Sequence, residues 1–162
     1  MPSRAAELIE RLELRPHPEG GFFREIFRSE HAVMPDDGRG IRAAITTIYF
    51  LLTRDTVSRW HRVRSDEVWH LYEGGPLELL EADLNGETVA RHTLGVAGDG
   101  DRIPVHVVSA ARWQAARTTG EYALMGCSVG PGFDFADFEL LADDREASQA
   151  MQERWPEFAS LL

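Results

Sequence analysis

WHRVRSDEVWHLYEGG, residues 60–75, carries the pattern from which the fold is predicted. On either side of the polar segment Arg64–Asp66, apolar and polar side chains alternate as they do in β-strands. Because side chains alternate across a strand, His61 and Val63 share one face of the first strand. If the polar segment forms a hairpin turn, Glu67 lies on the same face of the second strand. The stretch therefore predicts a histidine and a carboxylate together on an apolar β surface.

Similar strand and turn signals continue on both sides of this stretch. The run IRAAITTIYFLL, residues 41–52, is rich in β-branched and aromatic side chains and predicts a central strand. LELLEADL and ETVARHTL flank Asn85–Gly86, a dipeptide typical of tight hairpin turns. Further strands are predicted over residues 22–27, 105–109, 111–117 and 122–129. Roughly nine or ten short strands, with turn signals every 8–12 residues or so, predict an all-β sandwich or barrel.

A short helix is predicted at each end of the chain. Ser3 can cap a helix that runs to about Leu12. Asp143 or Asp144 can open a second helix that reaches about Trp155, where Pro156 stops it. With no linker or repeat between these ends, residues 1–162 are interpreted as one domain.

Charge and cysteine content narrow the classes of function. The chain has 17 Lys and Arg against 27 Asp and Glu, for a formal net charge of −10. An acidic chain without a basic run is a poor partner for nucleic acid or for an anionic membrane. The single cysteine, Cys127, allows no internal disulfide and fits a reducing compartment. We therefore expect a cytoplasmic protein whose ligand is a small molecule.

The opening stretch resembles the first sequence motif of the cupin superfamily, H-x-H-x3-E-x6-G. His61, Glu67 and Gly74 occupy the first histidine, the glutamate and the glycine, but Val63 stands in place of the second histidine. The second cupin motif, P-x-G-x2-H, has its best match in Ser109–Arg117. There Ser109 and Ala111 replace the proline and the glycine, and Gln114 replaces the histidine.

Longer phrases resemble one small, uncharacterised cupin family, sometimes called the fifth cupin subfamily. The phrases are HPEGGFFRE, TTIYFLL, SRWHRVRSDEVWHLYEGGPLEL and VGPGFDFADFELL, and the resemblance extends from Leu8 to about Leu141. It implies an antiparallel jelly-roll barrel that forms a homodimer. It implies no particular activity, because cupins include dioxygenases, isomerases, dTDP-sugar epimerases and non-catalytic binders.

The barrel interior is the predicted ligand site. A small barrel either fills with side chains or leaves room for one small ligand. The mixture of aromatic and polar candidates suggests a polar ligand that contains a ring, such as a nucleoside, a sugar nucleotide or an aromatic acid. The residues expected to line the pocket are Tyr49, His61, Val63, Glu67, Trp69 and Gln114, with Arg24 from the strand that follows Gly20 and Gly21.

The incomplete cupin motifs argue against a metal in the barrel. If a metal binds at the cupin position, only His61, Glu67 and Gln114 remain to hold it, and an amide oxygen is a poor ligand for a transition metal. We therefore expect no tightly bound cofactor there, with a divalent metal as the less favoured alternative. Other histidines, namely His17, His31, His92 and His106, are interpreted as structural.

Three functions stay open at this point. In the first, His61 takes a proton from a carbonyl compound and Glu67 assists, as in a metal-independent isomerase or epimerase acting on a sugar nucleotide or a related substrate. In the second, the barrel binds or senses a small ligand without chemistry. The third, a metal-dependent oxygenase, is the least favoured because ligands are missing.

Overall fold

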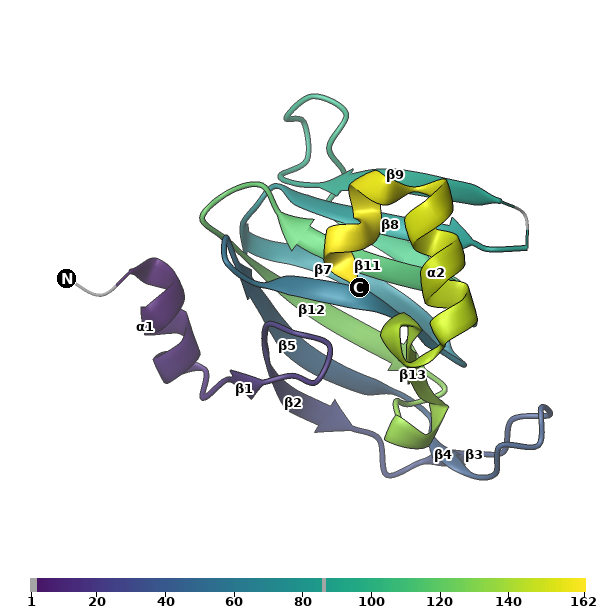
Figure 1. The fold of residues 1–162 in the computed structure, drawn as a ribbon. Coiled ribbons are helices and arrows are strands. Elements are labelled where there is room, and N and C mark those ends of the chain that lie inside the picture. Colours follow the sequence, from purple (N-terminus) through teal and green to yellow (C-terminus); the bar gives the residue numbers. More distant parts are fainter. Residues whose placement is uncertain (1–2, 86) are drawn as a thin grey trace.

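The computed structural model describes residues 3–85 and 87–162, and its strands form two facing antiparallel sheets (Figure 1). In spatial order, the six-stranded sheet contains β1 (Arg15–Pro16), β2 (Phe22–Arg28), β5 (Thr46–Thr53), β12 (Tyr122–Gly130), β7 (Asp66–Gly74) and β10 (Val105–Val108). The five-stranded sheet contains β13 (Phe138–Leu140), β6 (Val57–Val63), β11 (Trp113–Thr118), β8 (Leu77–Asp83) and β9 (Thr88–Leu94). A separate pair, β3 (Ala32–Val33) and β4 (Arg42–Ala43), extends from one end.

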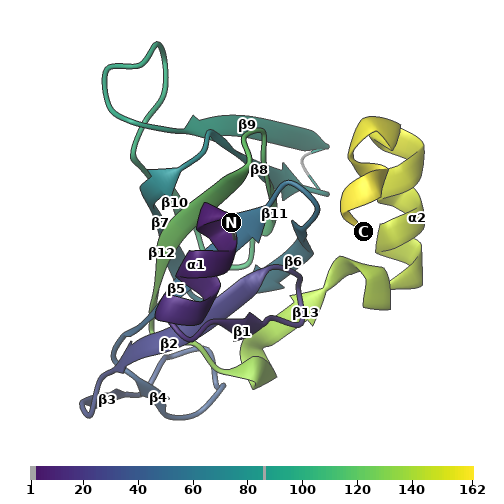
Figure 2. The same cartoon turned by 90° about the vertical axis from the view of Figure 1, so that its left-hand side faces the viewer.

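The helices lie outside the two sheets. The helix α1 (Arg4–Arg11) begins after Ser3, whose hydroxyl accepts a hydrogen bond from the Ala6 N–H. The helix α2 (Arg145–Arg154) is capped by Asp144 and is followed by the 3₁₀ helix η3 (Pro156–Leu161). Figure 2 shows α1 beside the six-stranded sheet and α2 with η3 on the far side of the five-stranded one. These positions confirm the predicted jelly roll with a short helix at each end.

Three apolar clusters account for the layers. The central cluster fills the space between the sheets, with Phe50 and Trp69 among its largest members. A second cluster lies between the five-stranded sheet and α2 with η3, and a third lies between the six-stranded sheet and α1. Each sheet is therefore covered on its inner face and on part of its outer face. No described helix is long and apolar enough to cross a membrane.

The connection Arg64–Asp66 differs from its prediction. It is not a hairpin, because β6 pairs with β11 and β13 whereas β7 pairs with β12 and β10. The chain instead turns a corner from one sheet into the other. His61 and Glu67 still face each other across the interior, because the inner faces of both sheets point to the same core.

Of two other predicted elements, one is divided and the other is described only in part. Residues 41–52 do not form one strand, since β4 ends at Ala43 and β5 begins at Thr46. The strands β8 and β9 pair as the predicted hairpin, but Gly86 of the predicted Asn85–Gly86 turn lies outside the described residues. The strands β6 to β12 otherwise follow the predicted order closely.

Candidate functional site

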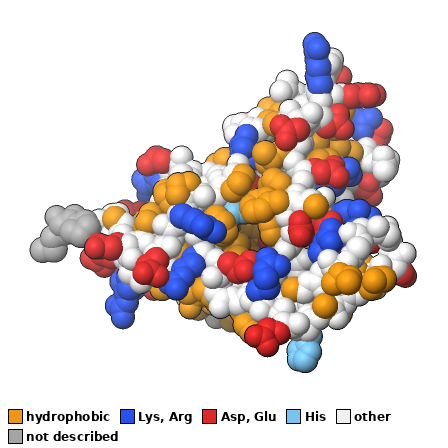
Figure 3. All heavy atoms as spheres, turned by 90° about the horizontal axis from the view of Figure 1, so that it is seen from below, with side chains coloured by type: hydrophobic (Ala, Val, Ile, Leu, Met, Phe, Trp, Pro, Cys, Tyr) orange, Lys and Arg blue, Asp and Glu red, His pale blue; other side chains and the backbone are white. Residues whose placement is uncertain are grey.

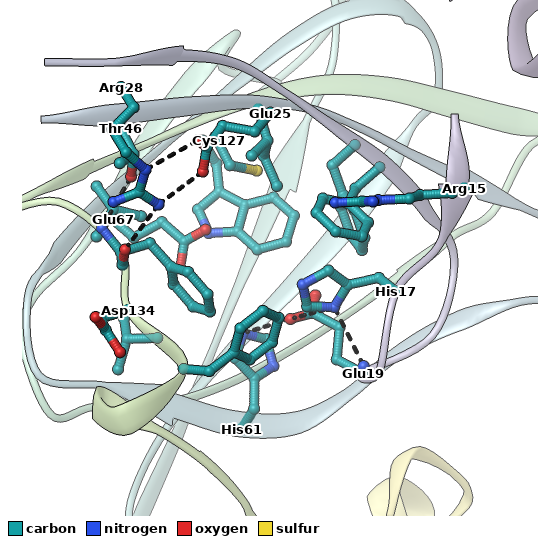
Figure 4. Close-up of a pocket in the computed structure, with 18 residues that line it drawn as sticks. Arg15, His17, Glu19, Glu25, Arg28, Thr46, His61, Glu67, Cys127 and Asp134 are labelled. Carbon is teal, nitrogen blue, oxygen red and sulfur yellow. Dashed lines mark hydrogen bonds and ion pairs between the residues drawn. The ribbon is translucent and has the colours of Figure 1, made fainter. Parts of the chain in front are cut away.

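A cavity of about 340 Å³ opens between the sheets near β1 and β2. Figure 3 shows hydrophobic side chains around a depression on this side of the molecule, with arginine and acidic groups beside them. The cavity has an apolar wall, a group of buried acids and histidines, and a charged mouth (Figure 4). The apolar wall consists of Phe23, Ile48, Phe50, Val63, Trp69, Val129, Phe133 and Phe135.

His61, on β6, lies in the cavity with one ring nitrogen committed and the other available. Its side chain is 2 % exposed. Nδ1 is 2.7 Å from the carbonyl oxygen of Arg59, so Nδ1 carries the proton and donates it. In the neutral ring Nε2 is therefore the unprotonated nitrogen. Burial lowers the pKa of His61, which keeps the ring neutral near pH 7.

Glu19 approaches His61 from the loop between β1 and β2. Its Oε2 is 3.3 Å from His61 Nε2, and its Oε1 accepts a hydrogen bond of 2.7 Å from the Ser58 hydroxyl. Burial raises the pKa of Glu19 to about 8, although the bond from Ser58 opposes this shift. At neutral pH the proton of this pair therefore resides on Glu19 and the imidazole is neutral.

The loop that carries Glu19 depends on two glycines. Gly20 has a φ of +112°, and a Cβ placed there would lie 2.0 Å from the carbonyl oxygen of Val57. Glycine alone permits this close approach, which brings the loop against β6. His17 precedes it, and its Nδ1 accepts the Glu19 backbone N–H at 3.2 Å. Burial, followed by the nearby His61, lowers the pKa of His17 to about 4.

Glu67, on β7, reaches the cavity from the opposite sheet. Its Oε2 accepts a hydrogen bond of 2.6 Å from the Gln114 amide, whose oxygen accepts the indole N–H of Trp69 at 3.0 Å. The Trp69 donor thus determines which end of the amide faces Glu67. Burial raises the pKa of Glu67 to about 7, while the nearby His61 works in the other direction.

Charged side chains stand at the mouth of the cavity. The Arg28 guanidinium makes two hydrogen bonds to the Glu25 carboxylate, of 2.9 and 2.8 Å. Arg28 reaches the cavity because the β2–β5 register shifts between Glu25 and Phe27, which interrupts the alternation of β2. Arg15 lies over the Phe23 ring at 5.1 Å and has no carboxylate partner among the described residues. Arg15 is therefore a cation available to an anionic group on a ligand.

The structure brings together four of the seven residues predicted to line the pocket, namely His61, Val63, Glu67 and Trp69. Tyr49 and Arg24 do not belong to the lining. They are paired in register on neighbouring strands and share the outer face, where Tyr49 packs in the cluster beneath α1 and Arg24 pairs with Glu13 at 2.7 Å. Gln114 is fully buried behind the lining and holds Glu67.

Sequence reasoning missed several lining residues, notably Glu19, His17, Arg15 and Arg28. The HPEGG string was the available signal for the first two, since a glycine pair beside a histidine and an acid indicates a loop held close to another segment. For Arg28 no signal existed, because the shift in register on β2 is not visible in the pattern.

The residues at the cupin metal position do not fit a metal. Val63 offers no donor atom, and both ends of the Gln114 amide are already engaged by Glu67 and Trp69. In the described ranges, one group of three His, Cys, Asp or Glu side chains has donor atoms all within 4.8 Å of one another. That group, Glu81, His92 and His106, contains no residue of the cavity lining.

Comparisons with known proteins agree with this architecture. The family model described as "Cupin superfamily (DUF985)" matches residues 6–141. A hypothetical protein from Leishmania major is 30% identical, with a TM-score of 0.82 over 98% of this chain and 96% of that one. A protein from Shewanella oneidensis is 31% identical, with a TM-score of 0.82 over 99% of this chain and 95% of that one.

A more distant match shows the fold alone. Oxalate decarboxylase from Bacillus subtilis is 13% identical, with a TM-score of 0.57 over 91% of this chain and 37% of that one. No curated protein matches the chain. The match of the family model to most of the sequence, together with the two relatives of similar length, shows that the chain belongs to the family described as "Cupin superfamily (DUF985)".

Proposed function

We propose that this protein is a metal-independent isomerase or epimerase that moves a proton on a sugar nucleotide or a related carbonyl compound. The observation that carries the proposal is the meeting of His61 with two buried carboxyl groups in one cavity. Such buried acids are costly to maintain unless they are paired or used.

The protonation states suit a two-group proton transfer. His61 presents an unprotonated Nε2, and its 3.3 Å separation from Glu19 Oε2 is long for a hydrogen bond, so the lone pair can accept a proton from a ligand. Glu67, with a pKa of about 7, is about half protonated at neutral pH and can donate. The two groups come from opposite sheets, as delivery of a proton to a second face requires.

The proposed reaction begins when His61 Nε2 removes a proton from the carbon next to a substrate carbonyl. The electron pair of that C–H bond moves toward the carbonyl and forms an enolate. Glu67 then delivers its proton to the opposite face of the same carbon, which restores the carbonyl and inverts the configuration at that carbon. His61 is left protonated beside Glu19, and Glu67 is left ionised, until exchange with water resets both.

The remainder of the site supports an anionic, ring-containing substrate. A cavity of about 340 Å³ lies at the small end of the range for ligand pockets and suits the reacting ring. The aromatic wall, including Phe23 and Phe133, can pack against that ring. Arg15 at the mouth can bind phosphate oxygens of the part that extends outward.

The test combines binding with isotope exchange. A panel of sugar nucleotides and aromatic or sugar acids is first screened by thermal shift, since a ligand at a hundredfold excess over Kd stabilises the fold by about 2.7 kcal/mol. Each hit is then incubated in D₂O, and deuterium incorporation at carbon is followed by NMR. We expect incorporation with wild type and a loss of at least about 100-fold in His61→Gln and Glu67→Gln.

The control is His31→Gln, which changes an exposed histidine that does not line the cavity and should exchange at the wild-type rate. If His61→Gln binds the hit and exchanges as fast as wild type, the catalytic assignment is wrong. If wild type binds ligands tightly but supports neither exchange nor turnover, the barrel is a binding or sensing module.

A further inference from the structure

A second group of ionisable side chains lies away from the cavity, where the edges of the two sheets meet. It consists of Glu81 on β8, His92 on β9 and His106 on β10. The strands β9 and β10 are the last strands of the five-stranded and six-stranded sheets respectively. Figure 2 shows both at the same end of the two layers, and they contact each other there. We call this place the seam.

All three side chains turn inward toward the seam. Glu81 follows Leu77 and Leu79 on the inner face of β8, because side chains two apart share a face. His92 is opposite Leu79 in the β8–β9 register, and His106 is opposite Trp69 in the β7–β10 register. Three strands from two sheets therefore direct donor atoms to one point.

The donor atoms converge on a single carboxylate oxygen. His106 Nε2 is 2.6 Å from Glu81 Oε2, and His92 Nε2 is 2.9 Å from the same atom. The two imidazole rings are stacked with centroids 3.7 Å apart. His92 Nε2 is buried, and although Glu81 Oε2 is 2.9 Å away, this nitrogen makes no properly directed hydrogen bond within the described chain. An unsatisfied buried nitrogen of this kind is costly and needs an explanation.

We propose that Glu81, His92 and His106 form a binding site for a divalent first-row transition-metal ion that ties the two sheets together at the seam. Two imidazoles and one carboxylate are a ligand set suited to Zn²⁺, Fe²⁺ and similar ions. The ion would give His92 Nε2 a partner. It would also replace the crowding of two nitrogens around one oxygen with three separate bonds.

The dimensions agree with this assignment after a small adjustment. Ligand bonds of about 2.0–2.1 Å in tetrahedral geometry place donor atoms about 3.3 Å apart. The two measured N–O separations, 2.6 and 2.9 Å, need to widen by less than 1 Å, and the stacked rings need to turn apart. The three side chains are 12 to 26 % exposed, so water can reach the ion and complete its coordination.

The site is independent of the proposed reaction, because none of its three residues lines the cavity. Its expected effect is on the fold. A metal that binds only the folded chain stabilises it by mass action, and here it would join β8, β9 and β10 across the two sheets. Apo protein should therefore open first at the seam.

The experiment uses tag-free protein stripped of metal and titrated with ZnCl₂ or CoCl₂. We expect one ion per chain, visible d–d absorption with Co²⁺ and a higher unfolding temperature. Loss of an outer-shell partner costs a metal site about 10–100-fold in affinity, so His92→Gln and His106→Gln should each cost more than about 100-fold. His31→Gln is the matched control and should bind as wild type does.

A second measurement on wild type does not depend on the folding of any variant. Imidazole ¹⁵N NMR should show Zn²⁺ shifting the Nε2 signals of two histidines, assigned to His92 and His106. Absence of stoichiometric binding, binding that survives both substitutions, or shifts that map to His17 or His61 would each overturn the proposal.

Discussion

Replacement of Glu19 by glutamine should alter how the stability of the protein depends on pH. The pKa of Glu19 is about 8 in the folded protein, against 4.5 as the reference value. Between these limits the folded state retains a proton that the unfolded state has released. Stability is therefore highest below pH 4.5 as far as this group is concerned, and it falls as pH rises toward 8. At about 1.4 kcal/mol per pH unit, the whole interval corresponds to about 5 kcal/mol.

Other buried groups determine the window in which Glu19 can be measured. The pKa of Glu67 is raised to about 7, so its contribution to the free energy of unfolding also falls as pH rises, but only up to about that pH. His17, with a pKa of about 4 against 6.5, acts oppositely, because its unfolded form takes up a proton as pH falls below 6.5. Burial also lowers the pKa of His61, which gives the same sign as His17. Between pH 7 and 8 Glu19 is the main contributor, and it accounts for about 1 kcal/mol, because the folded carboxyl group itself begins to ionise near its pKa.

The assay is urea unfolding of wild type and Glu19→Gln at closely spaced pH values from 6.5 to 8.5. Glutamine can accept the Ser58 hydrogen bond and cannot ionise, so the variant should lose this decline in unfolding free energy while wild type keeps it. Glu30→Gln, at an exposed position, serves as the control and should follow wild type. Parallel curves for wild type and Glu19→Gln between pH 7 and 8 would refute the protonation state assigned to this site.

Three further changes test other parts of the structure. Gln114→Leu removes the buried amide that donates to Glu67 and accepts from Trp69. Because the carboxyl group and the indole N–H both lose their partner, urea unfolding should show about 2–4 kcal/mol of destabilisation, and a loss under about 0.5 kcal/mol would contradict the network. Gly20→Ala places a Cβ 2.0 Å from a β6 carbonyl oxygen, so it should lower the melting temperature and the affinity of the cavity for any ligand. The control Gly38→Ala adds a Cβ in open space and should leave ligand affinity unchanged. Phe27 is 54 % exposed and Met34 is 74 % exposed, and both belong to an apolar surface beside β2 and β3. We therefore expect light scattering to find a homodimer for wild type and a monomer for Phe27→Glu, and a monomeric wild type at micromolar concentration would contradict this.

The sequence by itself determined the positions of most strands along the chain, the two capped helices and the family, because these depend on local patterns. Turn residues and alternation specify strands within short windows, and Ser3 and Asp144 satisfy helix N–H groups from adjacent positions. The spacing of His61 and Glu67 was also sufficient to bring both to one cavity. It was sufficient even though the connection between them is a corner and not a hairpin, since either connection keeps the two on an inner face.

Which face of a strand points inward was decided only by the tertiary structure. Tyr49 and Arg24 are predicted from the sequence to line the pocket, but they lie on the outer face of the six-stranded sheet. The alternation in β5 is ambiguous because α1 covers its outer face, so that β5 carries apolar side chains on both sides. A period of two identifies which residues share a face, and only the position of the second sheet determines which face is enclosed.

The tertiary structure also decided which distant residues meet. Glu19 reaches His61 from a loop about forty residues earlier in the chain, beside Gly20, which fits against β6. No pattern in the sequence relates Glu81, His92 and His106, which belong to three different strands. They converge because two sheet edges meet at the seam. Pairing between strands distant in sequence depends on global packing and on register, so no local pattern of residues encodes these encounters.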